Sequence, residues 1–234
     1  MRKKRIDMIR PGRFGSMVWA DNWRDEFDVS NETILYHRIP VDFVFLGDSI
    51  TNGWDLNAYF GRNGKYVVNR GIPGDTTVYA LKRFAADVLQ LKPGCVIIKI
   101  GINNMAPLDA WKEEERRDPE DIFGEIAGDL RKMAELSLEN GIATVLCSLL
   151  PTCIEQLTTD IARRALVLKV NEEIERICAD TGAVYVDYHS HMVLEDGKTL
   201  RPELAYDGLH PHVLGYDIMA EVLRRKLDRQ GISI

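Results

Sequence analysis

The sequence predicts an α/β protein with one largely parallel sheet, and two observations lead to this fold class. Five short apolar runs are rich in β-branched residues, as is typical of strands buried on both faces. Segments with helical periodicity alternate with these runs, and repeats of strand, helix and strand build parallel sheets with right-handed crossovers. The length of 234 residues, with 45% hydrophobic and 28% charged residues, suits one such domain.

The expected strands and helices can be placed by residue number. The apolar runs that we expect to form strands are residues 41–47, 65–69, 95–101, 142–148 and 183–187. The expected helices, which repeat apolar residues three or four positions apart, are residues 75–91, 119–139, 160–180 and 213–227. Gly141 and Gly182 stand two residues after the ends of two of these segments, where glycine commonly ends a helix.

Two segments lack this regular pattern. Residues 1–40 are less periodic, and we expect an N-terminal arm that packs on the domain formed by residues 41–234. Three aromatic residues are the expected anchors of the arm: Trp19, Trp23 and Phe27. Residues 105–118 contain Trp111 and a run of charges, and they indicate a long loop or an added helix. A solvated face is the preferred interpretation of that segment, and a lid or specificity loop is the alternative.

Charge and cysteine content restrict the function classes. A net charge of −6 does not favour nucleic-acid binding, which requires a basic surface. The basic start is interrupted by Pro11 and Gly12, so we expect no secretory signal, and no run reaches the roughly 18 apolar residues of a membrane span. The four cysteines form no C-x-x-C pair, and Cys95 and Cys147 fall in apolar runs. We therefore expect reduced, buried thiols and a cytoplasmic protein.

A serine and a histidine stand where a parallel sheet places its functional site, beyond the carboxyl ends of the strands. Ser49 follows the first expected strand directly, although by itself it fits a helix N-cap equally well. A hydroxyl needs a base to act as a nucleophile. His210 has Asp207 three residues before it, so the carboxylate can turn back onto the imidazole. His189 and His191 are rival bases without so compact a carboxylate partner.

Two further residues could stabilise an oxyanion. Gly74 lies after the second expected strand, where the missing side chain lets its backbone N–H approach a ligand closely. Asn103 lies after the third expected strand and carries a side-chain N–H. Taken singly, a turn glycine and a loop-capping asparagine explain these residues as well. Their order along the chain, after the nucleophile and before the Asp–His pair, favours a joint catalytic role.

At these positions the chain resembles the GDSL/SGNH hydrolase family, and the resemblance implies that residues 41–234 form an SGNH hydrolase domain. The resemblance covers about residues 41–225. The four matching blocks are residues 47–49, 71–75, 101–104 and 207–211. The common third block has Asp where this chain has Asn104, and the platelet-activating-factor acetylhydrolase-like branch also has Asn there.

The resemblance implies a three-layer α/β/α fold around a flavodoxin-like sheet of five parallel strands, with no metal or organic cofactor. It implies that Ser49 is the nucleophile, that His210 is the base and then the acid, and that Asp207 orients the histidine. The oxyanion hole would consist of the Ser49 backbone N–H, the Gly74 backbone N–H and the Asn103 side chain.

The resemblance further implies a serine esterase, and we expect it to remove a short acyl group, with acetyl preferred, from a carbohydrate or other small polar ester through an acyl-enzyme. Trp54, Arg70 and Asn104 lie near the site in the sequence and are candidate substrate-binding residues. The expected partner is the small ester substrate, with a homo-oligomer as an open expectation. The alternatives are a lysophospholipase or thioesterase, a metal-assisted phosphoesterase that uses Asp48, Asp207 and His210, and a non-catalytic carbohydrate-binding module.

Overall fold

A five-stranded sheet in which every strand is parallel to its neighbours forms the centre of the computed structural model, which describes residues 6–16, 18–61 and 64–234. The strand order is β2-β1-β3-β4-β5, the flavodoxin-like order. The strands are β1 Phe43–Gly47, β2 Val67–Gly71, β3 Cys95–Lys99, β4 Ala143–Cys147 and β5 Val184–Val186. The predicted sheet is confirmed, although β2 runs two residues further than expected because its pairing with β1 continues through Gly71.

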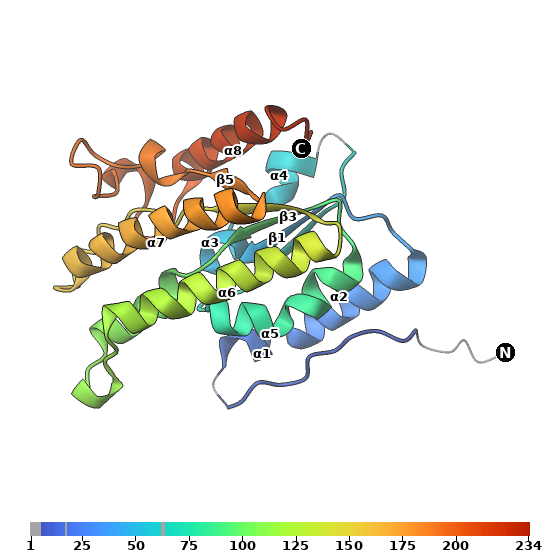
Figure 1. Ribbon diagram of the computed structural model, residues 1–234, viewed down its shortest axis with the longest axis horizontal. Helices are drawn as coiled ribbons and strands as arrows, with labels where there is room; N and C mark the ends of the chain where they lie inside the picture. The colour runs from blue at the N-terminus through green and yellow to red at the C-terminus, as the bar shows by residue number, and fades with distance from the viewer. Residues whose placement is uncertain (1–5, 17, 62–63) are drawn as a thin grey trace.

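Helices cover both faces of the sheet and complete three layers (Figure 1). Alternate residues of β1 enter opposite cores, because side chains of a strand point alternately to its two faces. One face is covered by α5 Thr77–Asp87, α6 Pro119–Glu139 and α7 Asp160–Thr181. The other is covered by α3 Ser49–Asn52, α4 Leu56–Phe60 and α8 Val213–Asp228. Burial on both faces explains why the strands read as continuous apolar runs, and the predicted α/β/α fold is confirmed.

The N-terminal segment contains helices that the sequence pattern did not indicate, α1 Trp19–Asn22 and α2 Arg24–His37. The buried residues of α2 have helical spacing, but two of the four are polar: Arg24, Phe27, Asn31 and Ile34. A stripe that alternates apolar with polar residues gives little hydrophobic periodicity. The polar members are satisfied by α5, since Arg24 and Asn31 both donate to the Asp87 carboxylate. The less periodic segment therefore contains two helices, and α2 contacts α5 through these hydrogen bonds.

The three expected anchors of this segment behave differently. Phe27 is buried, and Trp23 packs against it with ring centroids 6.1 Å apart. Trp19 is 59% exposed, so it does not anchor the segment by burial, contrary to expectation. The basic residues at positions 2–5 lie outside the described residues.

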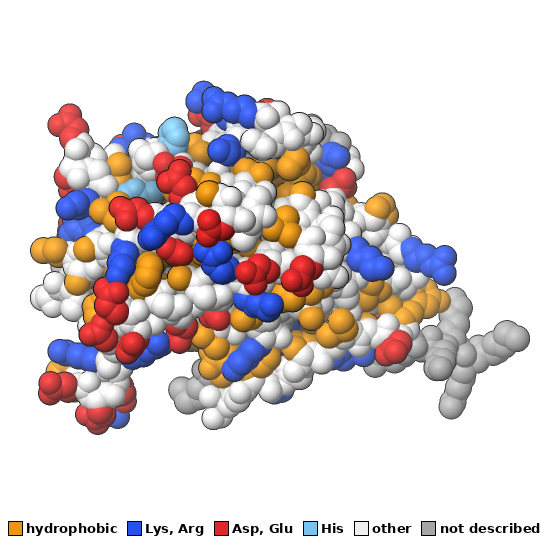
Figure 2. Space-filling view, in the orientation of Figure 1, with side chains coloured by type: hydrophobic (Ala, Val, Ile, Leu, Met, Phe, Trp, Pro, Cys, Tyr) orange, Lys and Arg blue, Asp and Glu red, His pale blue; other side chains and the backbone are white. Residues whose placement is uncertain are grey.

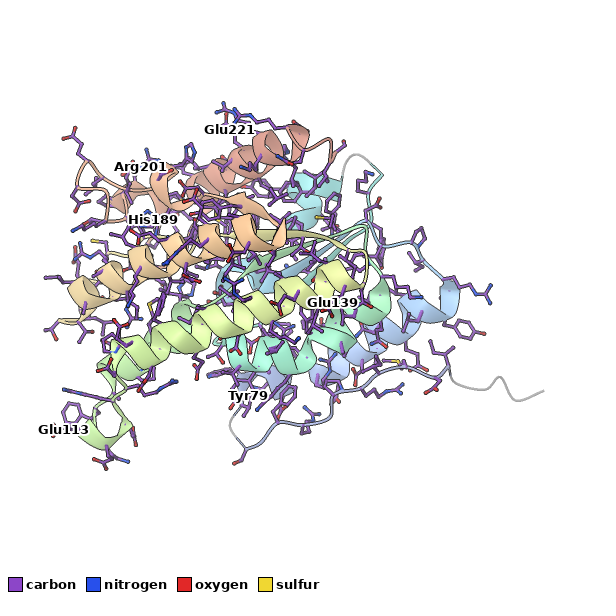
Figure 3. The ribbon with its side chains drawn as sticks, viewed as in Figure 1. Tyr79, Glu113, Glu139, His189, Arg201 and Glu221 are labelled. Carbon is purple, nitrogen blue, oxygen red and sulfur yellow. The ribbon has the colours of Figure 1, made fainter. Side chains whose placement is uncertain are left out.

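The remaining connections contain short 3-10 helices. These are η2 Leu89–Leu91, η3 Ile102–Asp109, η4 Glu113–Glu115, η5 His189–His191 and η6 Pro202–Leu204. η4 forms a projecting tip, which the label of Glu113 marks in Figure 3. Trp111, two residues before Glu113, is 96% exposed. In the space-filling view the tip carries acidic and basic side chains, and charges of both signs also cover α6 and α7 (Figure 2). Within the described parts of the chain, no helix is both long and apolar enough to cross a membrane.

Candidate active site

The candidate site lies at the carboxyl ends of β1, β2 and β3, where the strand order reverses and flavodoxin-like sheets form a crevice. Ser49 is the first residue of α3, directly after β1. Asp48 caps this helix by accepting the Ile50 N–H at 3.0 Å. The Asp48 carboxylate also pairs with the buried Lys99 ammonium at 3.3 Å. Asp48 therefore holds the turn that presents Ser49.

Three side chains form a continuous hydrogen-bonded chain. Ser49 Oγ lies 2.9 Å from His210 Nε2, and His210 Nδ1 lies 2.6 Å from Asp207 Oδ2. Asp207 Oδ1 accepts the backbone N–H groups of Leu209 and His210 at 2.9 and 2.7 Å. Partial burial would raise the pKa of the Asp207 carboxyl, but these hydrogen bonds outweigh burial and hold the pKa below its usual value. The carboxylate favours hydrogen on Nδ1, so Nε2 is left to accept the Ser49 proton.

A tight loop holds Asp207 and His210 in place. Gly208 has φ +74°, and a Cβ there would stand 1.9 Å from the carbonyl oxygen of Cys153. The Cys153 N–H in turn donates to the Gly208 carbonyl at 2.8 Å. Only glycine fits this left-handed position against another backbone. The side chains of Asp207 and His210 remain 54% and 44% exposed, so the site is open to solvent.

Three N–H groups at this edge are available to an incoming oxyanion. The backbone N–H groups of Ser49 and Gly74 have no acceptor within residues 6–16, 18–61 and 64–234. Gly74 has φ +75°, a conformation that glycine adopts readily. Asn103 Nδ2 donates one hydrogen to the Asp75 carbonyl at 2.9 Å and keeps a second hydrogen. These are the donors that the sequence predicted, and their joint role in an oxyanion hole stays a prediction.

A buried guanidinium that sequence reasoning missed connects the loops of the site. Arg83 on α5 is fully buried, and its Nε donates to Asp75 Oδ2 at 2.9 Å. Its Nη2 donates to the carbonyls of Gly47 and Arg70 at 3.3 and 2.9 Å, at the ends of β1 and β2. Arg83 thereby links the strand before Ser49 with the loop that carries Gly74. The only sequence signal was an i,i+4 pair with Asp87, a spacing that usually marks a solvated face.

The three predicted substrate-binding side chains are not at the site surface, which corrects that prediction. Trp54, Arg70 and Asn104 are each 3% exposed. Trp54 stacks on Tyr216 in the core, with ring centroids 5.5 Å apart. Arg70 donates to side chains of α2, and Asn104 donates to a glutamate of α6 and to the first threonine of α5. Proximity in sequence misled because each side chain turns inward and is buried against neighbouring parts of the fold.

The two rival histidines lie away from the Ser49 hydroxyl. His189 and His191 form η5 after β5. His189 is buried beside α7, its backbone N–H donates to Ser148, and burial lowers the pKa of its ring (Figure 3). In the part of the chain that the structure describes, the imidazole that bonds to Ser49 Oγ is that of His210.

Sequence comparisons identify the family and relatives of this chain. The GDSL-like Lipase/Acylhydrolase family matches residues 45–218. An acetylxylan esterase of Geobacillus stearothermophilus is 30% identical over 178 residues, which cover 74% of this chain and 76% of that protein. An acetylxylan esterase of Xylanibacter ruminicola is 25% identical over 205 residues, 76% of this chain. The match spans only 41% of that second, longer relative.

Solved structures show the same relationship. A GDSL-like lipase from Bacteroides thetaiotaomicron has a TM-score of 0.73 and 28% identity, over 91% of this chain and 100% of that one. The acetylxylan esterase from Geobacillus stearothermophilus has a TM-score of 0.63 and 27% identity, over 81% of this chain and 95% of that one. The family match covers well over half of the sequence. The chain therefore belongs to the GDSL-like lipase/acylhydrolase family and is a serine ester hydrolase.

Proposed function

We propose that this esterase removes acetyl groups from carbohydrates or similar small polar esters, through an acyl-enzyme on Ser49. The observation that carries the proposal is the hydrogen-bonded chain from Asp207 through His210 to Ser49. Two relatives that are acetylxylan esterases support an acetylated carbohydrate as substrate. The side chains of Asp207 and His210 are 54% and 44% exposed, so the hydrated alcohol part of a small polar ester can remain in contact with water at this site.

The reaction follows from the geometry. His210 Nε2 takes the Ser49 proton as Oγ attacks the ester carbonyl, and the Asp207 carboxylate stabilises the imidazolium that forms. The carbonyl oxygen gains negative charge and accepts hydrogen bonds from the Ser49 and Gly74 N–H groups and Asn103 Nδ2. The C–O bond to the alcohol then breaks, and the alcohol oxygen takes the proton from His210. Water repeats the sequence on the acyl-enzyme and releases acetate and free Ser49.

Ser49→Ala tests the nucleophile. We expect kcat/KM for p-nitrophenyl acetate to fall by about 10⁴-fold or more, since removing a triad member leaves only the contribution of binding and the oxyanion donors. Ser190→Ala is the matched control, because Ser190 is an exposed serine on η5. An organophosphonate should add its mass to the wild type and not to Ser49→Ala. Wild-type turnover in Ser49→Ala, with unchanged circular dichroism, would refute the assignment.

Acyl and alcohol preference test the substrate. Acetate release from acetylated xylo-oligosaccharides should exceed the background rate by several orders of magnitude in the wild type and vanish in Ser49→Ala. Among p-nitrophenyl esters, acetate should be preferred to octanoate. Faster cleavage of the octanoate ester would favour the lysophospholipase or thioesterase alternative.

A further inference from the structure

An exposed indole lies against the loop of the proposed oxyanion hole. Trp19, the first residue of α1, approaches Gly74 so closely that a Cβ on Gly74 would stand 2.8 Å from Cδ1 and 3.2 Å from Nε1 of the indole. Trp19 is nevertheless 59% exposed. The ring therefore covers one side of Gly74 and leaves much of its own surface open. No acceptor for its Nε1–H occurs among residues 6–16, 18–61 and 64–234.

The short helix that carries Trp19 is held firmly on the domain. The Asp21 carboxylate accepts the backbone N–H of Phe14 at 2.9 and 3.0 Å and that of Gly15 at 3.1 Å. Ala20 is buried in a small cluster with Phe27 and Ile72. Phe14 also packs on Tyr79 of α5, which Figure 3 labels beside the N-terminal segment. The backbone that carries the indole is therefore fixed beside Gly74 before a ligand binds.

Trp19 differs in its position from other exposed apolar side chains. Single exposed apolar side chains are common and need no explanation. Trp111 is such a case, since it projects from the tip near η4. Trp19 instead adjoins the loop that would bind the ester oxygen. Because an oxyanion lies about 3 Å from its donors, an ester held by the Gly74 N–H would place its reacting carbon beside the loop that the indole contacts.

We propose that Trp19 is a specificity-determining residue that stacks against the sugar ring of an acetylated carbohydrate; this inference rests on the proposed function. The C–H groups on one face of a sugar ring form an apolar surface that matches the indole face. The sugar hydroxyls can stay hydrated at an open site, and one of them can accept the Nε1–H. The interaction involves the alcohol part of the ester, so loss of the indole should not change kcat/KM for a small ester whose alcohol has no ring.

Trp19→Ala tests the subsite when sugar and non-sugar esters are compared. We expect kcat/KM for acetylated xylo-oligosaccharide to fall about 10- to 100-fold, mainly through KM, in the range of an aromatic contact in a binding site. For ethyl acetate, which has no ring, kcat/KM should change less than about threefold. Trp19→Phe should recover much of the sugar activity. Trp111→Ala, the matched control, should leave both substrates unaffected.

The outcomes separate this inference from the proposed function. Equal losses on both esters would overturn it, because the indole would then only support Gly74. An unchanged KM for the sugar ester in Trp19→Ala would also overturn it. The proposed function is tested by other results: it would be refuted if acetyl-sugar turnover survived Ser49→Ala or were absent from the wild type. Absence from the wild type would refute the sugar subsite as well. Binding of the acetylated oligosaccharide to Ser49→Ala, weakened by Trp19→Ala in the same background, would support the subsite without catalysis.

Discussion

Asp207→Asn should disable the proposed base while it keeps most of the loop intact. The amide oxygen can take the place of Oδ1, which accepts the N–H groups of Leu209 and His210. The amide nitrogen then faces His210 Nδ1 in place of the present acceptor, Oδ2. The ring must accept at Nδ1, so its hydrogen moves to Nε2 and points at the Ser49 hydroxyl. In this tautomer the imidazole cannot take the serine proton.

The magnitude follows from two costs. Returning the ring to the working tautomer breaks one neutral hydrogen bond, about 1 kcal/mol. The imidazolium also loses a bond to a charged partner, about 1.5–3 kcal/mol in general and near the lower end here, because water screens side chains that are 54% and 44% exposed. Together they amount to about 2.5–3 kcal/mol and predict a loss of about 10²-fold in kcat/KM. The corresponding change in a serine protease, whose aspartate is buried, costs about 10⁴-fold.

The assay is kcat/KM for p-nitrophenyl acetate, with circular dichroism as the check on folding. Ser49→Ala gives the floor of activity. Asp228→Asn is the matched control, since Asp228 is an exposed aspartate at the end of α8. Activity of Asp207→Asn within about threefold of the wild type would refute the tautomer argument. A loss as large as that of Ser49→Ala would show that solvent does not weaken the bond between Asp207 and the imidazolium as assumed.

Three further predictions address the architecture. Gly208→Ala should lower kcat/KM at least about 100-fold and reduce Tm by several degrees, because its Cβ would meet the Cys153 carbonyl oxygen 1.9 Å away and move the loop; a wild-type rate would contradict this. Arg83→Met should destabilise the fold by about 3–5 kcal/mol in urea unfolding, because it leaves Asp75 and Asp87 as buried carboxylates without this partner, whereas the exposed neighbour Lys82→Met should not. Burial raises the pKa of the Cys95, Cys147 and Cys178 thiols to about 12, whereas Cys153 is half-buried. At pH 8 an aromatic disulfide reagent should therefore titrate only Cys153 in the native protein and all four thiols after denaturation. Rapid reaction of the other three in the native protein would refute their burial.

Sequence patterns predicted elements well where independent local signals agreed. The helices over residues 119–139 and 160–180 match α6 Pro119–Glu139 and α7 Asp160–Thr181 nearly to the residue, because apolar periodicity and a following glycine both mark them. The helix α2 escaped the same reasoning because it buries Arg24 and Asn31 beside apolar residues. Burial of such groups depends on a partner, the Asp87 carboxylate, that lies 63 and 56 residues away.

Local patterns determined the strand runs and the pairing of Asp207 with His210, because each depends on residues that are close along the chain, and the order of four short blocks along the chain indicated the family. Tertiary structure decided the contacts between distant segments: Ser49 Oγ meets a ring 161 residues away, and Trp19 reaches Gly74. It also decided that Trp54 is buried, although its closeness to Ser49 in the sequence had suggested a residue that contacts substrate. The physical reason is that sequence spacing limits which side chains can approach within one element, whereas packing of helices on the sheet decides which surfaces are left for a substrate.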